Sequence, residues 1–176
     1  MTLISPEYRS LQSQLHAEEE SYGSASLAFA DQIAKLIERR GIRSMVDYGA
    51  GKQRLFHALQ ERLPSMPEYH PYDPALDAIS ASPEPAELVV CIDVLEHVEP
   101  EHLDAVLDDL ARVVQGLGFF SIASYAAQRV LADGRNAHLI QQPMEWWLPR
   151  LWTRFRTPAV NALPDGFWVM TTLRDG

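Results

Sequence analysis

The 176-residue chain contains a single cysteine, Cys91, so an intrachain disulfide bond is excluded, as is a zinc site built from several cysteines. No apolar run reaches the roughly 20 residues that a membrane-spanning helix needs. The first residues lack the basic segment followed by an apolar segment that marks a secretory signal peptide. These absences predict a cytoplasmic protein without a membrane segment.

Basic residues are also few, because 15 Lys and Arg stand against 24 Asp and Glu and give a net charge of −9. Proteins that bind nucleic acid through its phosphates rely on clustered cations, so this balance weighs against a nucleic-acid partner. The rest of the composition, 47% hydrophobic and 22% charged, is that of an ordinary globular protein. The length predicts one domain that spans residues 1–176.

Helix-like and strand-like segments alternate along the chain. Helical spacing of apolar residues predicts helices over residues 6–20, 24–40, 52–63, 100–115 and 144–155. Short apolar runs predict strands over residues 42–48, 68–73, 87–93 and 117–123, with a final pair at 155–160 and 166–173. The alternation predicts an α/β fold with a doubly wound, mostly parallel sheet. The strongly apolar run 87–93 predicts a central strand that is covered on both faces.

A glycine turn follows the first predicted strand. Residues 47–51 read Asp-Tyr-Gly-Ala-Gly, and glycine there permits a tight turn and a close approach of the backbone to a ligand. The dinucleotide fingerprint would need a glycine at Arg54, and the phosphate-binding P-loop pattern is absent as well. Asp73 ends the next strand, where a carboxylate can bind both hydroxyls of a ribose. Together the two features indicate an adenosine ligand without a pyrophosphate, although the turn alone could be structural.

Three polar residues follow the apolar strand at 87–93. Asp93, Glu96 and His97 would share one side if they form a helical turn, and such strand ends are where ligands bind in open α/β sheets. His138 lies in a polar stretch after the next strand, and we expect that stretch to return over the same edge of the sheet. Such a cluster can act as a general base or bind Mg²⁺ or Mn²⁺, and a purely structural role is the alternative.

These segments resemble the class I S-adenosylmethionine-dependent methyltransferases over about residues 20–173. The matching stretches are Val46–Gly51, Tyr72–Pro74 and Val90–Val98. The resemblance implies a Rossmann-like methyltransferase sheet. The connection from Asp73 to Glu87 is too short for the family's helix–strand–helix, so we expect the seven-stranded sheet to lack one strand. Gln53 stands where the family has its third glycine.

The resemblance also implies a cofactor, S-adenosylmethionine, and the residues that bind it. Residues 1–23 would form a helical lid over the cofactor, with Tyr22 near its methionine end. The implied cofactor-binding residues are Tyr22, Asp47, Tyr48, Gly49, Ala50, Gly51, Asp73, Pro74, Asp93, Val94 and Leu95.

The acid-x-x-Glu-His pattern is further similar to the small-RNA 3′-terminal 2′-O-methyltransferases, and ubiquinone-pathway O-methyltransferases carry Glu-His-Val at the same point. The first resemblance implies a Mg²⁺ or Mn²⁺ site, with Asp93 in place of the family's first Glu. The implied metal ligands are Asp93, Glu96, His97 and His138, and the implied catalytic residues are His97, Glu96 and His138.

The function that these features favour is methyl transfer to a small polar acceptor, through a hydroxyl of that acceptor. Methyl transfer is an in-line displacement at a sulfonium, so the enzyme mainly positions the acceptor. A base or a metal is needed only if a hydroxyl must lose its proton. Two alternatives stay open: a cofactor-binding but inactive domain that acts in an assembly, and 2′-O-methylation of RNA 3′ ends. The remaining histidines show no partner pattern and are predicted at the surface: His16, His57, His70 and His102.

Overall fold

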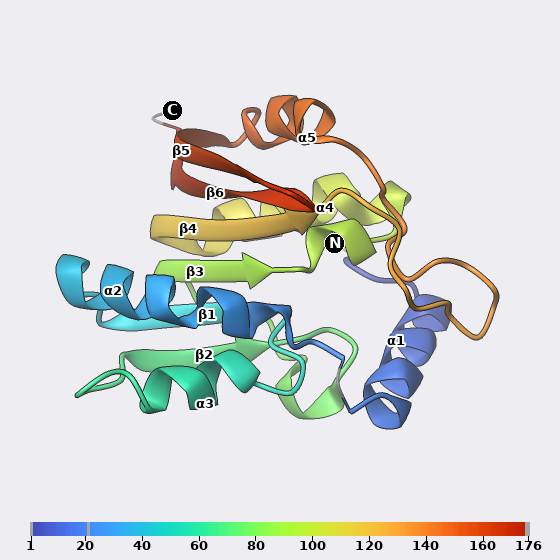
Figure 1. Cartoon of the computed structure of the whole chain (residues 1–176), viewed down its shortest axis with the longest axis horizontal. Helices are drawn as coiled ribbons and strands as arrows, with labels where there is room; N and C mark the ends of the chain where they lie inside the picture. The colour runs from blue at the N-terminus through green and yellow to red at the C-terminus, as the bar shows by residue number, and fades with distance from the viewer. Residues whose placement is uncertain (1, 21, 175–176) are drawn as a thin grey trace.

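Figure 1 presents the computed structural model of the chain, which describes residues 2–20 and 22–174. Six strands form one sheet in the order β2-β1-β3-β4-β6-β5. β1, β2, β3 and β4 pair in parallel, whereas β6 runs antiparallel to β4 and β5. This confirms the predicted doubly wound, mostly parallel Rossmann-like sheet. The strands are β1 (Ser44–Tyr48), β2 (Glu68–Tyr72), β3 (Ala86–Ile92), β4 (Val114–Ala123), β5 (Phe155–Leu163) and β6 (Gly166–Leu173).

The predicted loss of one strand is confirmed within the described residues. The connection from β2 to β3 holds only a short 3-10 helix, Asp77–Ile79. β2 is therefore an edge strand. An edge strand tolerates Pro71, which has no N–H to donate to a further neighbour.

Helices cover both faces of the sheet (Figure 1). They are α1 (Pro6–Glu18), α2 (Ala30–Arg40), α3 (Arg54–Gln60), α4 (Leu103–Val113) and α5 (Met144–Leu151). All five are shorter than predicted, and the backbone of two of them shows why. The segment before α2 is a 3-10 helix, Ala25–Phe29. α3 begins only at Arg54, because Gln53 has a left-handed backbone, with φ of 54°, and so cannot be part of a right-handed helix.

Alternate residues of β3 face two separate cores. Leu88 and Val90 pack with α2 and α3, and Val89 and Cys91 pack with α4 and α5. All four side chains are fully buried. This confirms the prediction of a central strand that is covered on both faces. The thiol of Cys91 is part of this packing, and burial raises its pKa.

α1 lies beyond the carboxyl ends of β1 and β2, beside the long loop that follows β4 (Figure 1). Ser5 caps the helix by accepting a hydrogen bond from the N–H of Tyr8. Tyr8 and Leu15 form a third, smaller core with Leu131 and Ala137 of that loop. Within the predicted lid, positions 1 and 21 lie outside the described residues. Among the helices that the structure describes, none has the length and apolar character to span a membrane.

Candidate cofactor site and active site

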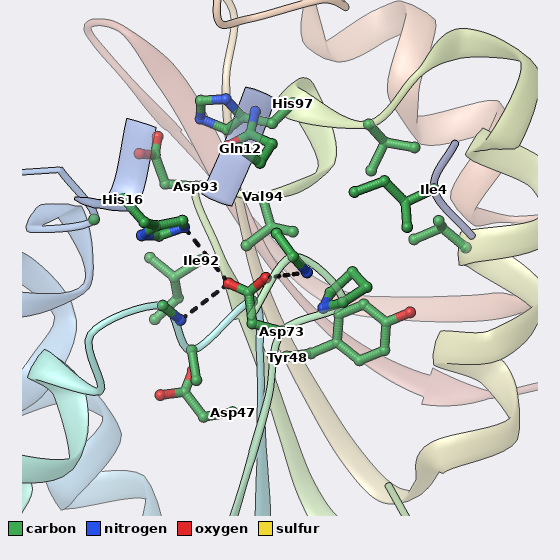
Figure 2. A pocket seen from close by; sticks show the side chains of 18 of the residues that line it. Ile4, Gln12, His16, Asp47, Tyr48, Asp73, Ile92, Asp93, Val94 and His97 are labelled. Carbon is green, nitrogen blue, oxygen red and sulfur yellow. Dashed lines mark hydrogen bonds and ion pairs between the residues drawn. The ribbon is translucent and has the colours of Figure 1, made fainter. Parts of the chain in front are cut away.

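The pocket of interest lies at the carboxyl ends of β1, β2 and β3 (Figure 2). β2 pairs with one side of β1 and β3 pairs with the other. The order in which strands are added to the sheet therefore reverses at β1 and β3. Open α/β sheets bind ligands at such a switch point. α1 covers this pocket and contributes side chains to its wall.

The turn after β1 is held by two hydrogen bonds and shaped by two glycines. The N–H groups of Gly49 and Ala50 donate to the carbonyl of Tyr72, at 2.7 and 2.9 Å. Gly49 has φ of 84°, and a Cβ there would lie 2.3 Å from Cγ2 of Val94. Gly51 has φ of 47°, and a Cβ would lie 2.9 Å from the ring of His16. Both positions therefore require glycine for conformation and for space.

Asp73 points into the pocket from the end of β2 (Figure 2). Its side chain is largely buried, with 7% of the residue exposed. The N–H of Gly51 donates to Oδ2 at 3.2 Å, and the N–H of Ala75 donates to Oδ1 at 2.9 Å. These bonds fix the carboxylate and leave lone pairs that can accept hydrogen bonds from a ligand.

Asp47 is a second buried acid beside the pocket. Its Oδ2 accepts a 2.6 Å hydrogen bond from the hydroxyl of Tyr69. Burial raises the pKa of Asp47 to about 6, and the charge of nearby Asp73 also raises it. Asp47 is therefore a group whose charge depends on pH near neutrality.

Asp93 directly follows β3 and has a left-handed backbone, with φ of 59°. Its N–H donates to the carbonyl of Ser121 at 3.2 Å, which holds the turn against β4. A non-glycine residue in this conformation is strained, and such residues concentrate at functional sites. The turn brings the carboxylate of Asp93 to His97 and His138, with one ligand atom of each within 4.8 Å of the others.

His97 and His138 are oriented by backbone carbonyls. Nδ1 of His97 lies 2.8 Å from the carbonyl of Ala137, and Nδ1 of His138 lies 2.7 Å from that of Tyr125. Because a carbonyl only accepts, Nδ1 carries the hydrogen in both rings, and Nε2 offers a lone pair when the ring is neutral. Burial lowers the pKa of His97 to about 4, so this ring is neutral at pH 7.

Glu96 lies outside this group of three. It is fully buried, and its Oε1 accepts a 2.5 Å hydrogen bond from the N–H of Ala123 in β4. Residues Leu95–His97 form a 3-10 helix (η3), in which successive side chains point about 120° apart. Glu96 and His97 therefore point in different directions, and the expected single turn that would place Asp93, Glu96 and His97 on one side is not formed, although Asp93 and Glu96 still interact. Burial, together with the charge of Asp93, raises the pKa of Glu96 well above its usual value.

α1 supplies site residues that the sequence analysis missed. Tyr8, Gln12 and His16 line the pocket and recur at four-residue spacing on one face of the helix. That spacing of polar and aromatic residues was the available signal. The side chain of His16 is only 10% exposed and lies against Asp73, so its predicted surface position is wrong. Burial lowers the pKa of this imidazole.

Hydrogen bonds hold both ends of α1 in place. The hydroxyl of Ser5 donates to Glu99 at 2.6 Å, and the N–H of Ser5 donates to the same carboxylate at 2.7 Å. At the other end, the ammonium of Lys52 donates to the carbonyl of Glu19 at 2.7 Å. Since Lys52 directly follows the glycine turn, the position of α1 is tied to the backbone of the pocket.

The structure brings together most of the predicted cofactor-binding residues. Those that line the pocket are Tyr22, Asp47, Tyr48, Gly49, Ala50, Gly51, Asp73, Pro74, Asp93 and Val94. Leu95 does not line it, because its side chain is fully buried in the core beneath α4. His97 lines the pocket, whereas Glu96 and His138 lie outside its wall.

No protein-family model matches the chain, and no curated protein sequence is significantly similar to it. Solved structures do match. The 1,6-didemethyltoxoflavin-N1-methyltransferase of Burkholderia thailandensis, with bound S-adenosylhomocysteine, has a TM-score of 0.66 at 15% identity over 99% of this chain and 93% of that chain. The DhpI–S-adenosylhomocysteine complex has a TM-score of 0.62 at 15% identity, over 94% of this chain and 96% of that chain.

A third similar structure is the mitomycin 7-O-methyltransferase MmcR, with a TM-score of 0.66 at 15% identity. The match covers 92% of this chain and 60% of that longer one. At such identities the likeness establishes the fold. The chain has the Rossmann-like fold of the class I S-adenosylmethionine-dependent methyltransferases, with a sheet of six strands.

Proposed function

We propose that the protein is an S-adenosylmethionine-dependent methyltransferase that methylates a hydroxyl group of a small polar molecule. The observation that carries the proposal is the buried carboxylate of Asp73, fixed by the N–H of Gly51 beside a turn that requires both of its glycines. Such an acid suits the diol of a ribose, and the turn lets the rest of the cofactor approach the backbone. The bound S-adenosylhomocysteine of two similar structures supports this assignment.

A hydroxyl acceptor suits the chemistry beside this cofactor site. Asp93 and His97 line the same pocket, and the Nε2 lone pair of neutral His97 can accept a proton. The size of the acceptor is limited by α1, which we propose to act as a lid over the one methyltransferase domain. Because α1 and the loop after β4 pack together over the strand ends, a small molecule suits the pocket better than a polymer.

We further propose that Asp93, His97 and His138 bind a divalent cation. Their ligand atoms lie within 4.8 Å of one another, and both imidazoles donate Nδ1–H to a carbonyl, as metal-binding histidines generally do. Two imidazoles and one carboxylate suit Mn²⁺ better than Mg²⁺, which prefers oxygen ligands. A cation bound there would occupy Nε2 of His97 and lower the pKa of the acceptor hydroxyl, so His97 would be a ligand in the metal-bound form and a general base only without the metal.

The test of methyl transfer uses S-adenosylmethionine with a labelled methyl group and a panel of sugars, catechols and RNA 3′ ends. We expect label in a hydroxyl-bearing small molecule, and a strong loss of transfer in Asp93→Asn. Label only in RNA would contradict the small acceptor. An absence of transfer to every acceptor, together with clear cofactor binding, would favour the inactive, cofactor-binding alternative.

The test of the metal measures Mn²⁺ binding by calorimetry in the wild type, in His138→Ala and in the control His70→Ala. His70 lies on β2, with its side chain 39% exposed and outside the cluster. We expect binding to be lost in His138→Ala alone. Equal Mn²⁺ binding in all three proteins, or no binding in the wild type, would overturn the metal proposal and leave His97 as a general base.

A further inference from the structure

His16 is buried beside the candidate ribose site, and one of its nitrogens has no partner. Its Nε2 lies 3.7 Å from Oδ2 of Asp73, and only 10% of the side chain is exposed. Its Nδ1 is buried without a hydrogen-bond partner. Buried polar atoms in proteins are nearly always hydrogen-bonded, so the unpartnered Nδ1 marks a ring whose hydrogen bonds are incomplete without a ligand.

The surroundings of His16 fix the ring above the glycine turn. The ring packs edge-on against Tyr22, with centroids 4.8 Å apart. It also lies over Gly51, where a Cβ would come within 2.9 Å of its Cε1. Figure 2 shows the imidazole facing Asp73 from the opposite wall of the pocket. The ring thus lies across the pocket from the carboxylate that is assigned to the ribose.

We propose that His16 is a cofactor-binding residue that contacts the ribose diol together with Asp73, so that α1 contacts the cofactor directly. This inference rests on the proposed function, because it assumes a cofactor with a ribose. The 3.7 Å between Nε2 and Oδ2 is too long for a hydrogen bond, and a ribose hydroxyl can complete it by donating to Asp73 and accepting from His16.

One consequence is that cofactor binding and the docking of α1 are coupled. Without the cofactor, the docked helix leaves Nε2 of His16 too far from Oδ2 of Asp73 for a hydrogen bond, and a ribose hydroxyl between them completes the pairing. A ligand that contacts only the docked form shifts the helix toward it. His16 therefore contributes to affinity through the diol, whereas other residues of α1 contribute through packing.

The test compares two ligands that differ only in the diol: 5′-methylthioadenosine and its 2′,3′-dideoxy analogue. Their affinity ratio is measured by calorimetry in the wild type, His16→Ala, His16→Gln and Leu15→Ala. Leu15 is the matched control, because it anchors α1 in the small core with Leu131 but is absent from the pocket wall. We expect His16→Ala to reduce the diol preference at least fivefold, His16→Gln to retain part of it, and Leu15→Ala to weaken both ligands equally.

Circular dichroism melting of each variant establishes that the compared proteins are folded. An unchanged ratio in folded His16→Ala overturns the inference while the proposed function stands, provided that wild-type protein binds S-adenosylhomocysteine. A ratio that falls as much in Leu15→Ala as in His16→Ala also overturns it, because the effect then comes from the position of the helix. If the wild type does not bind S-adenosylhomocysteine, the proposed function fails and the inference fails with it.

Discussion

The hydroxyl of Tyr8 donates a 2.6 Å hydrogen bond to the backbone carbonyl of His97. The bond joins the first helix of the chain to η3, the short helix that carries the candidate active site, across 89 positions of sequence. The same hydroxyl accepts a 2.6 Å hydrogen bond from the side-chain amide of Gln12. Tyr8 is 3% exposed, so neither bond is replaced easily by water.

Replacing Tyr8 with Phe should therefore loosen α1 without changing its apolar packing. The carbonyl of His97 and the amide of Gln12 lose a partner, and such a loss costs about 1–3 kcal/mol of stability. We expect faster hydrogen exchange of the amides in residues 6–18, with β3 unchanged. Tyr125→Phe is the control, since that ring is 47% exposed. Equal protection of α1 in wild type and Tyr8→Phe would contradict this role.

Replacing Gln53 with Gly should stabilise the protein. Gln53 has φ of 54° and ψ of 33°, a left-handed conformation that costs a side-chain-bearing residue about 1–2 kcal/mol. Glycine removes that cost but loses more backbone entropy on folding, so a net gain of about 0.5–1 kcal/mol is expected. Urea unfolding measures the difference. A loss of stability would mean that the side chain of Gln53 makes a contribution larger than the strain.

Asp47 should make stability fall as pH rises. Burial raises its pKa from the ordinary value of 3.8 to about 6 in the folded protein. Folding is therefore favoured while the carboxyl group is protonated. This contribution is complete below about pH 4 and is lost as pH rises through about 6. The loss amounts to about 3 kcal/mol. Asp47→Asn should remove this part of the pH dependence, measured by unfolding between pH 4 and 7.

Replacing Tyr69 with Phe should change the pH dependence of stability in the direction opposite to Asp47→Asn. The hydroxyl of Tyr69 lowers the pKa of Asp47 by donating a hydrogen bond to the carboxylate. Without it the pKa of Asp47 should rise further, so the fall of stability should extend to higher pH and its total should increase. A smaller total loss of stability with pH in this variant would contradict the assignment of the effect to Asp47.

Replacing Gly49 with Ala should disrupt the turn. The new Cβ would lie 2.3 Å from Cγ2 of Val94, and the φ of 84° disfavours any side chain. We expect cofactor affinity to fall more than tenfold. Val94→Ala in the same chain should restore only part of the affinity, because it removes the clash but not the strain. Full restoration by Val94→Ala would mean that the backbone conformation of Gly49 has no importance.

The fold could be predicted from the sequence because its signals are local. The apolar run of β3 and the helical spacing of α4 each identify an element without knowledge of its neighbours. Gly49 and Asp73 were identified in the same way, since each follows directly from a strand end. The short connection after Asp73 predicted a missing strand because a helix–strand–helix needs more residues.

The parts that could not be predicted depend on contacts between distant segments. His16 reaches the pocket because α1 packs on a loop more than 100 residues away, and its spacing with Tyr8 and Gln12 indicates a shared helix face but not what that face contacts. The error at Glu96 has another cause. A left-handed Asp93 followed by a 3-10 helix replaces the expected α-helical turn, and a positive φ at a non-glycine residue leaves no pattern in the sequence.

The central claim is that Asp73 holds the ribose of S-adenosylmethionine, and calorimetric titration with S-adenosylhomocysteine tests it most directly. The control is Asp77→Asn, since the side chain of Asp77 is 94% exposed and pairs with Arg9 on the surface. We predict one-to-one binding to the wild type and to Asp77→Asn, and affinity lower by about 10–100-fold in Asp73→Asn, because hydrogen bonds to a charged group contribute about 1.5–3 kcal/mol. No binding to the wild type, or equal affinity in Asp73→Asn, would contradict the account.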